Sequence, residues 1–581
     1  MSGSRTALEQ VRVIEVIAEK GAWQPGECGR ISVVIQNLGT SSATMTLRVT
    51  LEDQGEERAT SERTLGLEPG TQTVEMLLTA PSVDARGYHL RAALMPRPKA
   101  DAGPTDSATM GDDDESPPQA LDAVGALLVI SHWSLAPRYG FLSEFAPAQD
   151  RLDAIADLTR FHLTALQFYD WMYRHYEYLP PEDLFTDAMG RTLSLETVRR
   201  RIEACKEHGI APIAYGAVYG AEREYADDHD GEVLRDAAGE RHALAERFFI
   251  TDPRPGPWRE RLLAEYERAV MELGFVGIHM DQYGSPKRAF DADGGAVDLA
   301  PALRDLIDAA DGKARAADPQ ARVLFNAVND WPIDAVATSR QAAVYIEVWA
   351  PHDRFRDLAS LATRARDLSG KQVVLAAYLN SFTEGGPRAE ASGRLATAVI
   401  NSSGAHHLLL GEGNGVLRDP YYPNHGHLSS EGVARMRRYY DHSAALHHYL
   451  FDPKLVDLSR TYATGANAEL ELDGAPVSAV PEAGAVWLHV TAAEPGTWIL
   501  NLVNLLGLES EAWNAPHDDP PVVDGLTLTL LPFLRRARAT WSTPDRAGGP
   551  TVLTVTSDGQ GRSSFALPPL YTWATLVIRE A

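Results

Sequence analysis

The sequence has little cysteine and a deficit of positive charge. Only Cys28 and Cys205 occur in 581 residues, far apart in the chain. They exclude a disulfide framework and a cysteine-rich zinc site, and nothing in them demands an oxidising compartment. Lysine and arginine number 54 against 80 aspartate and glutamate, which gives a formal net charge of −26. That charge repels phosphate backbones and anionic lipid surfaces, and so argues against nucleic acid and membrane partners, whereas neutral substrates are compatible with it.

The sequence also lacks a long hydrophobic run. A membrane-spanning helix needs about 18 or more consecutive apolar residues, and the chain contains no such run. Residues 1–21 alternate between apolar and polar, without the continuous apolar centre of a signal peptide. As it stands the chain is expected to be cytoplasmic, or secreted if a leader has been removed.

Hydropathy patterning divides the chain into four parts. In residues 1–99, short apolar or alternating runs are separated by Gly, Pro, Asn and Ser, which predicts an N-terminal immunoglobulin-like β-sandwich. Residues 100–119 contain no basic residue, three consecutive Asp and two consecutive Pro, and predict an acidic linker. Residues 451–581 return to strand-like alternation, which predicts a C-terminal β-sandwich.

The remaining part, residues 120–450, alternates short apolar runs with longer amphipathic segments, the pattern of βα units and a parallel sheet. Residues 194–209 are typical of the helices, because Ser194 can cap the start and Gly209 stands where a helix usually ends. Eight runs over about 300 residues predict a (β/α)8 TIM barrel as the catalytic domain of a multidomain chain. The runs are 126–133, 163–170, 210–219, 275–281, 322–328, 343–350, 372–380 and 406–412.

Polar and aromatic residues gather where these runs end, which is where the active site of a (β/α)8 barrel lies. Carboxylates and amides exchange hydrogen bonds with sugar hydroxyls, and aromatic rings cover the apolar faces of sugar rings. The set therefore predicts a site for a neutral, hydroxyl-rich ligand. The expected substrate-binding residues are Tyr169, Asp170, Trp171, His175, Tyr215, Gln282, Tyr283, Asn326, Trp349, Tyr378 and Glu412.

Some of these residues also have a structural interpretation. Asp170 can be a hydrogen-bonded strand terminus, with Trp171 and its aromatic neighbours packed against the next loop. Glu412 can instead form a structural salt bridge. Both alternatives stay open at the level of the sequence.

Two carboxylates, Asp281 and Glu347, end runs that are otherwise apolar. Asp is depleted from strands, and a charge at the end of a buried run costs free energy unless it is paired or used. The two residues end the fourth and sixth runs. Because adjacent strands lie about 4.8 Å apart, their carboxyl groups can reach the roughly 5–5.5 Å separation of a retaining glycosidase. An inverting hydrolase, with roughly 6.5–9.5 Å between the carboxyl groups, is the mechanistic alternative.

The neighbours of each carboxylate suggest its role. Glu347 is flanked by Ile346, Val348 and a tryptophan, surroundings that raise a carboxyl pKa and suit a general acid. Asp281 is followed by possible hydrogen-bond donors, which favour an ionised nucleophile. Two carboxylates and a shaped cleft suffice for this chemistry, so no cofactor or metal is expected.

Four segments, in this order along the chain, resemble glycoside hydrolase family 66, which contains endo-dextranases and cycloisomaltooligosaccharide glucanotransferases. They are residues 165–180, 274–284, 344–353 and 406–429. The resemblance implies a retaining enzyme that acts on α-1,6-glucans. It also implies that Asp281 is the nucleophile and Glu347 the acid/base, the pair chosen above from the residues themselves.

The segment between the last two runs bears on the reaction outcome. The cyclising enzymes of the family that the chain resembles carry an extra carbohydrate-binding module near the seventh strand, and residues 381–405 are too few for one. The leading prediction is therefore a retaining hydrolase of α-1,6-glucosidic linkages in dextran or isomaltooligosaccharides. A transglycosylase and a non-catalytic α-glucan-binding protein are the alternatives, and the oligomeric state is left open.

Overall fold

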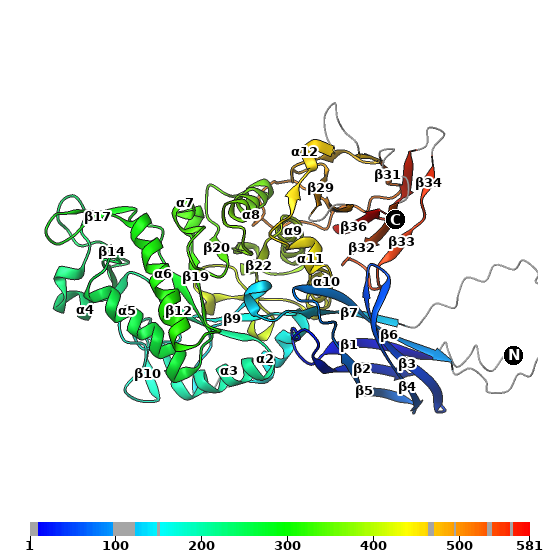
Figure 1. Cartoon of the computed structure of the whole chain (residues 1–581), viewed down its shortest axis with the longest axis horizontal. Helices are drawn as coiled ribbons and strands as arrows, with labels where there is room; N and C mark the ends of the chain where they lie inside the picture. The colour runs from blue at the N-terminus through cyan, green and yellow to red at the C-terminus, as the bar shows by residue number, and fades with distance from the viewer. Residues whose placement is uncertain are drawn as a thin grey trace, which may run out of the picture.

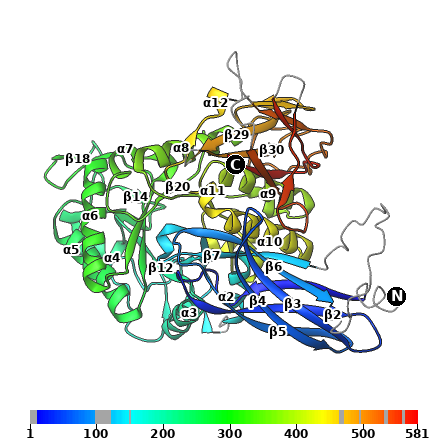
Figure 2. The ribbon, with the colours of Figure 1, turned by 45° about the vertical axis from the view of Figure 1, so that its right-hand side comes forward.

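The computed structural model describes residues 10–96, 122–147, 151–462, 470–492, 496–530, 537–557 and 562–580. The predicted linker, residues 100–119, lies outside these ranges. A large central part carries an N-terminal and a C-terminal β part, both on the same side of it (Figure 1 and Figure 2). Within the described residues, no helix is both long and apolar enough to cross a membrane.

The N-terminal part consists of two antiparallel sheets that share one hydrophobic core. The first has the order β1-β2-β5 and the second β4-β3-β6-β7. Their strands are β1 (Val11–Ala18), β2 (Cys28–Asn37), β3 (Ala43–Asp53), β4 (Glu56–Leu67), β5 (Gly70–Thr79), β6 (Arg86–Pro96) and β7 (Asp122–Val129). The sequence did not predict β4, because this edge strand is polar along most of its length.

The prediction for residues 126–133 was wrong. These residues were expected to be the first strand of the central barrel, but they overlap strand β7. It pairs antiparallel with β6 and belongs to the N-terminal part. Leu127 and Val129 face the N-terminal core, whereas Ala126 packs against Ala444 and Ala445 of a helix in the central part. Because both faces are covered, the run is as continuously apolar as a strand of a parallel sheet.

An eleven-stranded curled sheet forms the centre. Parallel pairing joins in turn β8 (Tyr139–Leu142), β9 (Ala165–Phe168), β12 (Ala211–Ala217), β16 (Gly277–Asp281), β19 (Arg322–Asn326), β20 (Val344–Glu347), β21 (Val373–Ala376) and β22 (His406–Leu408). One residue beyond β22, β23 (Leu410–Gly411) pairs parallel with β8. The short strands β24 (Gly415–Val416) and β25 (Gly426–His427) extend the sheet from there. Seven of the eight predicted runs thus contain strands of this sheet, and β8 takes the place of the run at 126–133.

Helices connect most of these strands. They are α2 (Asp153–Leu158), α3 (Leu195–Glu207), α4 (Arg223–Asp228), α5 (Pro257–Arg268), α6 (Leu299–Ala317), α7 (Ile333–Val336), α8 (Phe355–Ser369), α9 (Pro387–Ser402), α10 (Ser430–Ala445) and α11 (His447–Leu450). The prediction for residues 194–209 is confirmed by α3. The Ser194 side chain accepts a hydrogen bond from the Thr197 amide, and Gly209 adopts a φ of 69° just beyond the helix.

The C-terminal part again consists of two sheets around one core. One has the order β26-β29-β30-β36-β32-β33, with β28 beside β29, and the other β27-β31-β35-β34. The strands are β26 (Val456–Asp457), β27 (Leu470–Asp473), β28 (Val477–Ser478), β29 (Val486–Ala492), β30 (Thr497–Asn504), β31 (Thr527–Leu530), β32 (Ala537–Ser542), β33 (Thr551–Leu553), β34 (Thr556–Ser557), β35 (Ser563–Ala566) and β36 (Trp573–Glu580). A short helix, α12 (Ser459–Tyr462), follows β26.

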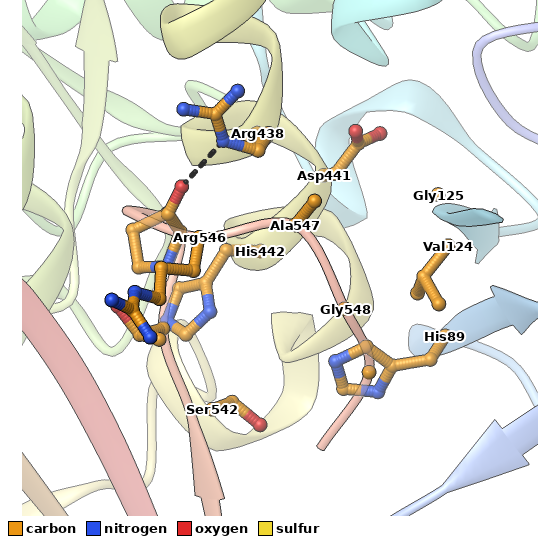
Figure 3. A pocket seen from close by; sticks show the side chains of 13 residues that line it. His89, Val124, Gly125, Arg438, Asp441, His442, Ser542, Arg546, Ala547 and Gly548 are labelled. Atoms are coloured by element: carbon orange, nitrogen blue, oxygen red, sulfur yellow. Dashed lines mark hydrogen bonds between the residues drawn. The ribbon is translucent and has the colours of Figure 1, made fainter. Parts of the chain in front are cut away.

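Helix α10 joins the three parts. The Cα of Gly87 in β6 lies so close to the Ala444 carbonyl oxygen that a Cβ would collide with it. On the C-terminal side, the Arg438 guanidinium donates to the Pro544 carbonyl at 3.0 Å. A pocket of about 70 Å³ lies at this junction, and Figure 3 shows His89 and Ser542 on its wall. None of its lining residues belongs to the predicted substrate site.

Candidate active site

A cavity of about 440 Å³ opens where the parallel strands of the central sheet end. Nine of the eleven expected substrate-binding residues and both expected catalytic carboxylates line it. The nine are Tyr169, Asp170, His175, Tyr215, Gln282, Tyr283, Asn326, Trp349 and Tyr378. The strand ends therefore bring together residues that are up to 209 positions apart in the sequence (169 to 378).

Asn326 stands between the two carboxylates. Asp281, Asn326 and Glu347 are the last residues of the neighbouring strands β16, β19 and β20. The Asn326 Nδ2 donates to Asp281 Oδ1 at 2.7 Å and to Glu347 Oε2 at 2.9 Å. Since both oxygens lie on one nitrogen, they cannot be farther apart than the sum of these two distances.

A tyrosine holds the second oxygen of each carboxylate. Tyr215 in β12 donates its hydroxyl to Asp281 Oδ2 at 2.9 Å, and Tyr378, just beyond β21, donates to Glu347 Oε1 at 2.9 Å. Every oxygen of the pair thus accepts a hydrogen bond, and the two carboxyl groups are fixed in orientation.

Enclosure by protein governs the protonation of the pair. Both carboxyl groups contact the cavity but are otherwise surrounded by protein, and this desolvation raises the pKa of Asp281 to about 7, with the charge of Glu347 as the second cause. Desolvation also raises the pKa of Glu347, against the hydrogen bonds from Asn326 and Tyr378. Two interacting carboxyl groups with raised pKa values favour a state in which one of them is protonated and the other ionised.

Asp170 and His175 form the wall next to Tyr215. Asp170 follows β9 with a φ of 46°, a left-handed conformation that Asp tolerates better than most residues, and its carbonyl accepts a hydrogen bond from Arg191 at 2.7 Å. The Asp170 Oδ1 lies 3.8 Å from His175 Nε2, and the imidazole stacks on Phe248 at 4.6 Å. Despite the desolvation of the buried ring, which lowers it, the pKa of His175 is raised by the neighbouring carboxylates of Asp170 and Glu222.

Several polar atoms on the cavity wall have no hydrogen-bond partner among the described residues. Asp170 Oδ1, Tyr283 Oη and Asn326 Oδ1 are buried without a hydrogen bond among the described residues. Buried polar atoms without a partner cost free energy, and a ligand rich in hydroxyl groups supplies the missing partners.

Trp349 lies on the Glu347 side of the cavity. Its side chain is 40% exposed, and its ring lies 5.8 Å from the ring of Tyr378, which bonds Glu347. An exposed indole beside the pair offers an apolar face to one ring of a sugar chain.

The structure does not bring Trp171 and Glu412 into the cavity. Trp171 is fully buried, donates to the Tyr215 carbonyl at 3.2 Å and packs on Phe275. Glu412 forms a buried ion pair with Arg201 at 2.5 Å and accepts the backbone amide of Ser143 at 2.6 Å. Neither side chain reaches the cavity. The structural alternatives given in the sequence analysis, packing for Trp171 and a salt bridge for Glu412, therefore describe these two residues.

Sequence reasoning missed several residues of the cavity wall. Gln167, His279 and Tyr345 lie within strands two residues before the predicted Tyr169, Asp281 and Glu347, and so share their face of the sheet. This two-residue spacing was the signal that could have found them. Tyr421 and Tyr422 come from a loop over Tyr169. The ring of Tyr422 stacks on Tyr169 with centroids 4.3 Å apart, and the ring of Tyr421 meets it edge-on at 6.2 Å.

Comparisons with known proteins identify the family. A family model described as glycosyl hydrolase family 66 matches residues 18–577. Two cycloisomaltooligosaccharide glucanotransferases from Niallia circulans are 26% and 25% identical over 414 and 416 residues, 67% of this chain and 40% and 41% of theirs. The chain thus spans about two fifths of the length of these curated relatives.

A solved structure extends the likeness to the whole fold. The crystal structure of a Paenibacillus sp. cycloisomaltooligosaccharide glucanotransferase in complex with cycloisomaltoheptaose has a TM-score of 0.86 to this chain at 21% identity. The match covers 97% of this chain and 99% of that one. With a family model that covers nearly the whole length, the chain belongs to glycosyl hydrolase family 66.

Proposed function

We propose that the chain is a retaining glycoside hydrolase that cleaves α-1,6-glucosidic linkages in dextran or isomaltooligosaccharides. The observation that carries this proposal is the amide of Asn326, which donates to both carboxylates. The sum of its two hydrogen-bond lengths is below the roughly 6.5 Å at which the range for inverting enzymes begins. A water molecule does not fit between the sugar and a carboxylate at that separation, so direct attack by the carboxylate is favoured.

The mechanism follows from the two roles. Asp281 attacks the anomeric carbon, the bond from that carbon to the leaving oxygen breaks, and Glu347 gives its proton to that oxygen. A glycosyl ester on Asp281 results. Glu347, now ionised, takes a proton from water, the water oxygen attacks the anomeric carbon, and Asp281 is released. Two inversions leave the anomeric configuration of the glucan unchanged.

The wall of the cavity supports a neutral sugar as the ligand. Unpartnered atoms of Asp170 and Tyr283 are available to hydroxyl groups, and Trp349 offers an apolar face. The protein's net charge of −26 disfavours anionic ligands. No step of this mechanism requires a cofactor.

The proposal includes a (β/α)8 barrel as the catalytic domain, between an immunoglobulin-like and a C-terminal β-sandwich. Pairing of β22 with β21 and of β23 with β8 supports closure of the central sheet through one interrupted strand. Because β7 pairs within the N-terminal sheets, we place the start of the barrel near Tyr139 instead of residue 120. For the end of the barrel near residue 450 and for the C-terminal domain at 451–581, we propose the bounds predicted from the sequence.

Transfer to a sugar hydroxyl is the second candidate, since the named relatives are glucanotransferases. In that reaction a hydroxyl of a glucan replaces water in the second step. The segment between β21 and β22 favours hydrolysis, because its residues form only the turn η7 (Asn380–Thr383) and helix α9 (Pro387–Ser402), without an inserted module.

The test is the release of reducing ends from dextran and from isomaltooligosaccharides, with Asp281→Ala and Glu347→Gln beside the wild type. We expect turnover by the wild type and a loss of at least about 10³-fold in both variants. Mass spectrometry of the products separates the candidates, because cyclic products lack the water that hydrolysis adds. Sugar binding by the wild type without any turnover would contradict both hydrolysis and transfer, and would indicate a glucan-binding protein.

A further inference from the structure

One end of the active-site cavity carries an apolar rim that the mechanism does not use. Met189 and Leu244 line the cavity there and are 37% and 40% exposed. Large apolar side chains that stay exposed at the mouth of a binding cavity indicate a contact surface for a ligand. We refer to these two residues as the Met189–Leu244 rim.

The rim is held in place by charged residues behind it. The turn with Met189 is fixed by the buried Asp187, which accepts the Met189 amide at 3.0 Å and the Arg191 side chain at 2.7 Å. Arg191 in turn bonds the carbonyl of Asp170 on the cavity wall at 2.7 Å. The turn is therefore connected to the wall of the sugar site through Arg191.

Arg247 ties the second half of the rim to the first. It lies in the turn between the paired strands β14 (Ala243–Leu244) and β15 (Phe248–Ile250), and its guanidinium donates to the Ala188 carbonyl at 2.9 Å. The hairpin turn has non-glycine residues with φ of 50° and 56° at Ala245 and Glu246, a conformation that costs free energy and persists only when the surroundings hold it. Two loops far apart in sequence are thus joined over one end of the cavity.

The proposed mechanism identifies which part of the substrate reaches this end. The leaving sugar lies beside the acid Glu347, and therefore near Tyr378 and Trp349. The sugar that stays on Asp281 extends the other way, past Tyr215 and His175, whose rings lie 6.4 Å apart. The rim lies next to His175 in this direction, because Phe248, which stacks on His175, pairs with Leu244 in the hairpin.

We propose that the Met189–Leu244 rim binds a glucose ring on the non-reducing side of the cleaved bond, beyond the ring attached to Asp281. The inference rests on the proposed α-1,6-glucan function and adds a chain-length determinant to it. Methionine suits such a surface because its flexible thioether adapts to an irregular apolar face. Substrates long enough to reach the rim gain affinity from it, and shorter ones do not.

The test measures nitrophenol release from 4-nitrophenyl α-glycosides of isomaltose, isomaltotriose and isomaltotetraose, so that only the non-reducing side grows. For the wild type we expect kcat/KM to rise once the chain reaches the rim. In the double variant Met189→Ser/Leu244→Ser, kcat/KM on the substrates that reach the rim should be about tenfold lower than in the wild type. On the shortest substrate it should change little. A matched control is Met271→Ser/Leu368→Ser, which removes two exposed side chains of the same types outside the cavity.

The outcomes separate this inference from the proposed function. If the double variant keeps the full rise with chain length, the rim is not a sugar subsite. If the wild type releases no nitrophenol, the hydrolase proposal fails, and calorimetric titration with the free isomaltooligosaccharides decides the inference. Tighter binding of the longer sugars by the wild type than by the double variant supports it, whereas equal affinity or no binding overturns it.

Discussion

At the scale of single residues, Asn326 lowers the pKa of both carboxyl groups of the proposed catalytic pair. Its amide donates to one oxygen of Asp281 and to one of Glu347, and both bonds lower the pKa values that desolvation raises. Tyr378 donates only to Glu347. The two donors therefore have separable effects on the dependence of the rate on pH.

Replacement of Asn326 by alanine should raise the pKa of both carboxyl groups. We expect the acidic and the basic limb of kcat/KM against pH to move to higher pH, because the nucleophile must be ionised and the acid protonated. The rate at its optimum should fall by about 10²-fold, as for the loss of a preorganised donor. Tyr378→Phe is the comparison and should move only the basic limb. A profile that keeps its shape in Asn326→Ala contradicts the bridging role.

Asp281 should lower the stability of the protein in alkaline solution. Its pKa is raised to about 7, whereas in an unfolded chain it is about 3.9. Between these values the folded protein holds a proton that the unfolded chain has lost, so stability falls as the pH rises. Asp281→Asn removes the charge and keeps an acceptor oxygen for Asn326. We expect its melting temperature to exceed that of the wild type by about 2 °C or more at pH 8, and the difference to shrink toward pH 5. A difference in melting temperature that grows toward acid pH would contradict the raised pKa of Asp281.

Strand ends were the part of the site that the sequence could predict. A polar residue that ends an apolar run can be recognised from the sequence alone, which is why Asp281, Asn326 and Glu347 were singled out, and all three line the cavity. The roles of Trp171 and Glu412 depended on whether each side chain turns into the cavity or away from it, and the residue type alone does not determine that direction. Tyr422 comes from a loop whose path over Tyr169 no local pattern specifies.

At the scale of secondary-structure elements, the apolar runs predicted strands correctly but assigned one of them to the wrong sheet. Strand β7 is apolar on both faces because it is covered by the N-terminal core and by helix α10. Strand β8 has only four residues and is too short to stand out from its surroundings. Strand pairing is a long-range property, so the pattern of one run could not decide between these two.

The Arg201–Glu412 ion pair is expected to stabilise the junction of elements behind the cavity. It joins helix α3 to the end of β23 and to the chain after β8, and both side chains are buried. Glu412→Ala leaves a buried guanidinium without its counter-charge and should cost about 3–5 kcal/mol. The measurement is the urea midpoint of unfolding.

A double variant provides the control for this pair. Arg201→Met/Glu412→Leu removes both charges and should recover most of the midpoint, because well-packed apolar residues replace buried ion pairs at little cost. If Glu412→Ala keeps its midpoint and loses substrate binding instead, Glu412 is a substrate contact after all.

At the scale of the whole molecule, helix α10 holds the two β parts against the centre. The sequence predicted both parts from their alternating strands, but it could not predict that they lie on the same side of the central sheet (Figure 1). The contacts that place them include close approaches such as Gly87 against Ala444 and Arg438 against Pro544. These depend on the docked surfaces and leave no pattern in the sequence.

A methyl group at Gly87 should loosen the N-terminal part from helix α10. Because the added Cβ collides with the Ala444 carbonyl, we expect Gly87→Ala to lower the melting temperature by several degrees. Gly66→Ala is the matched control, since Gly66 lies in the same sheet and has open space around its Cβ position. Equal melting temperatures for the two variants would argue against tight docking at this contact.

The most direct test of the central claim is to trap the glycosyl-enzyme. In Glu347→Gln, an α-isomaltosyl fluoride still reacts, since fluoride leaves without an acid, but water is no longer activated. We expect a mass increase of one isomaltosyl group, located by peptide mapping to the segment that contains Asp281. An adduct on another residue, or release of the β-anomer without any adduct, would contradict it.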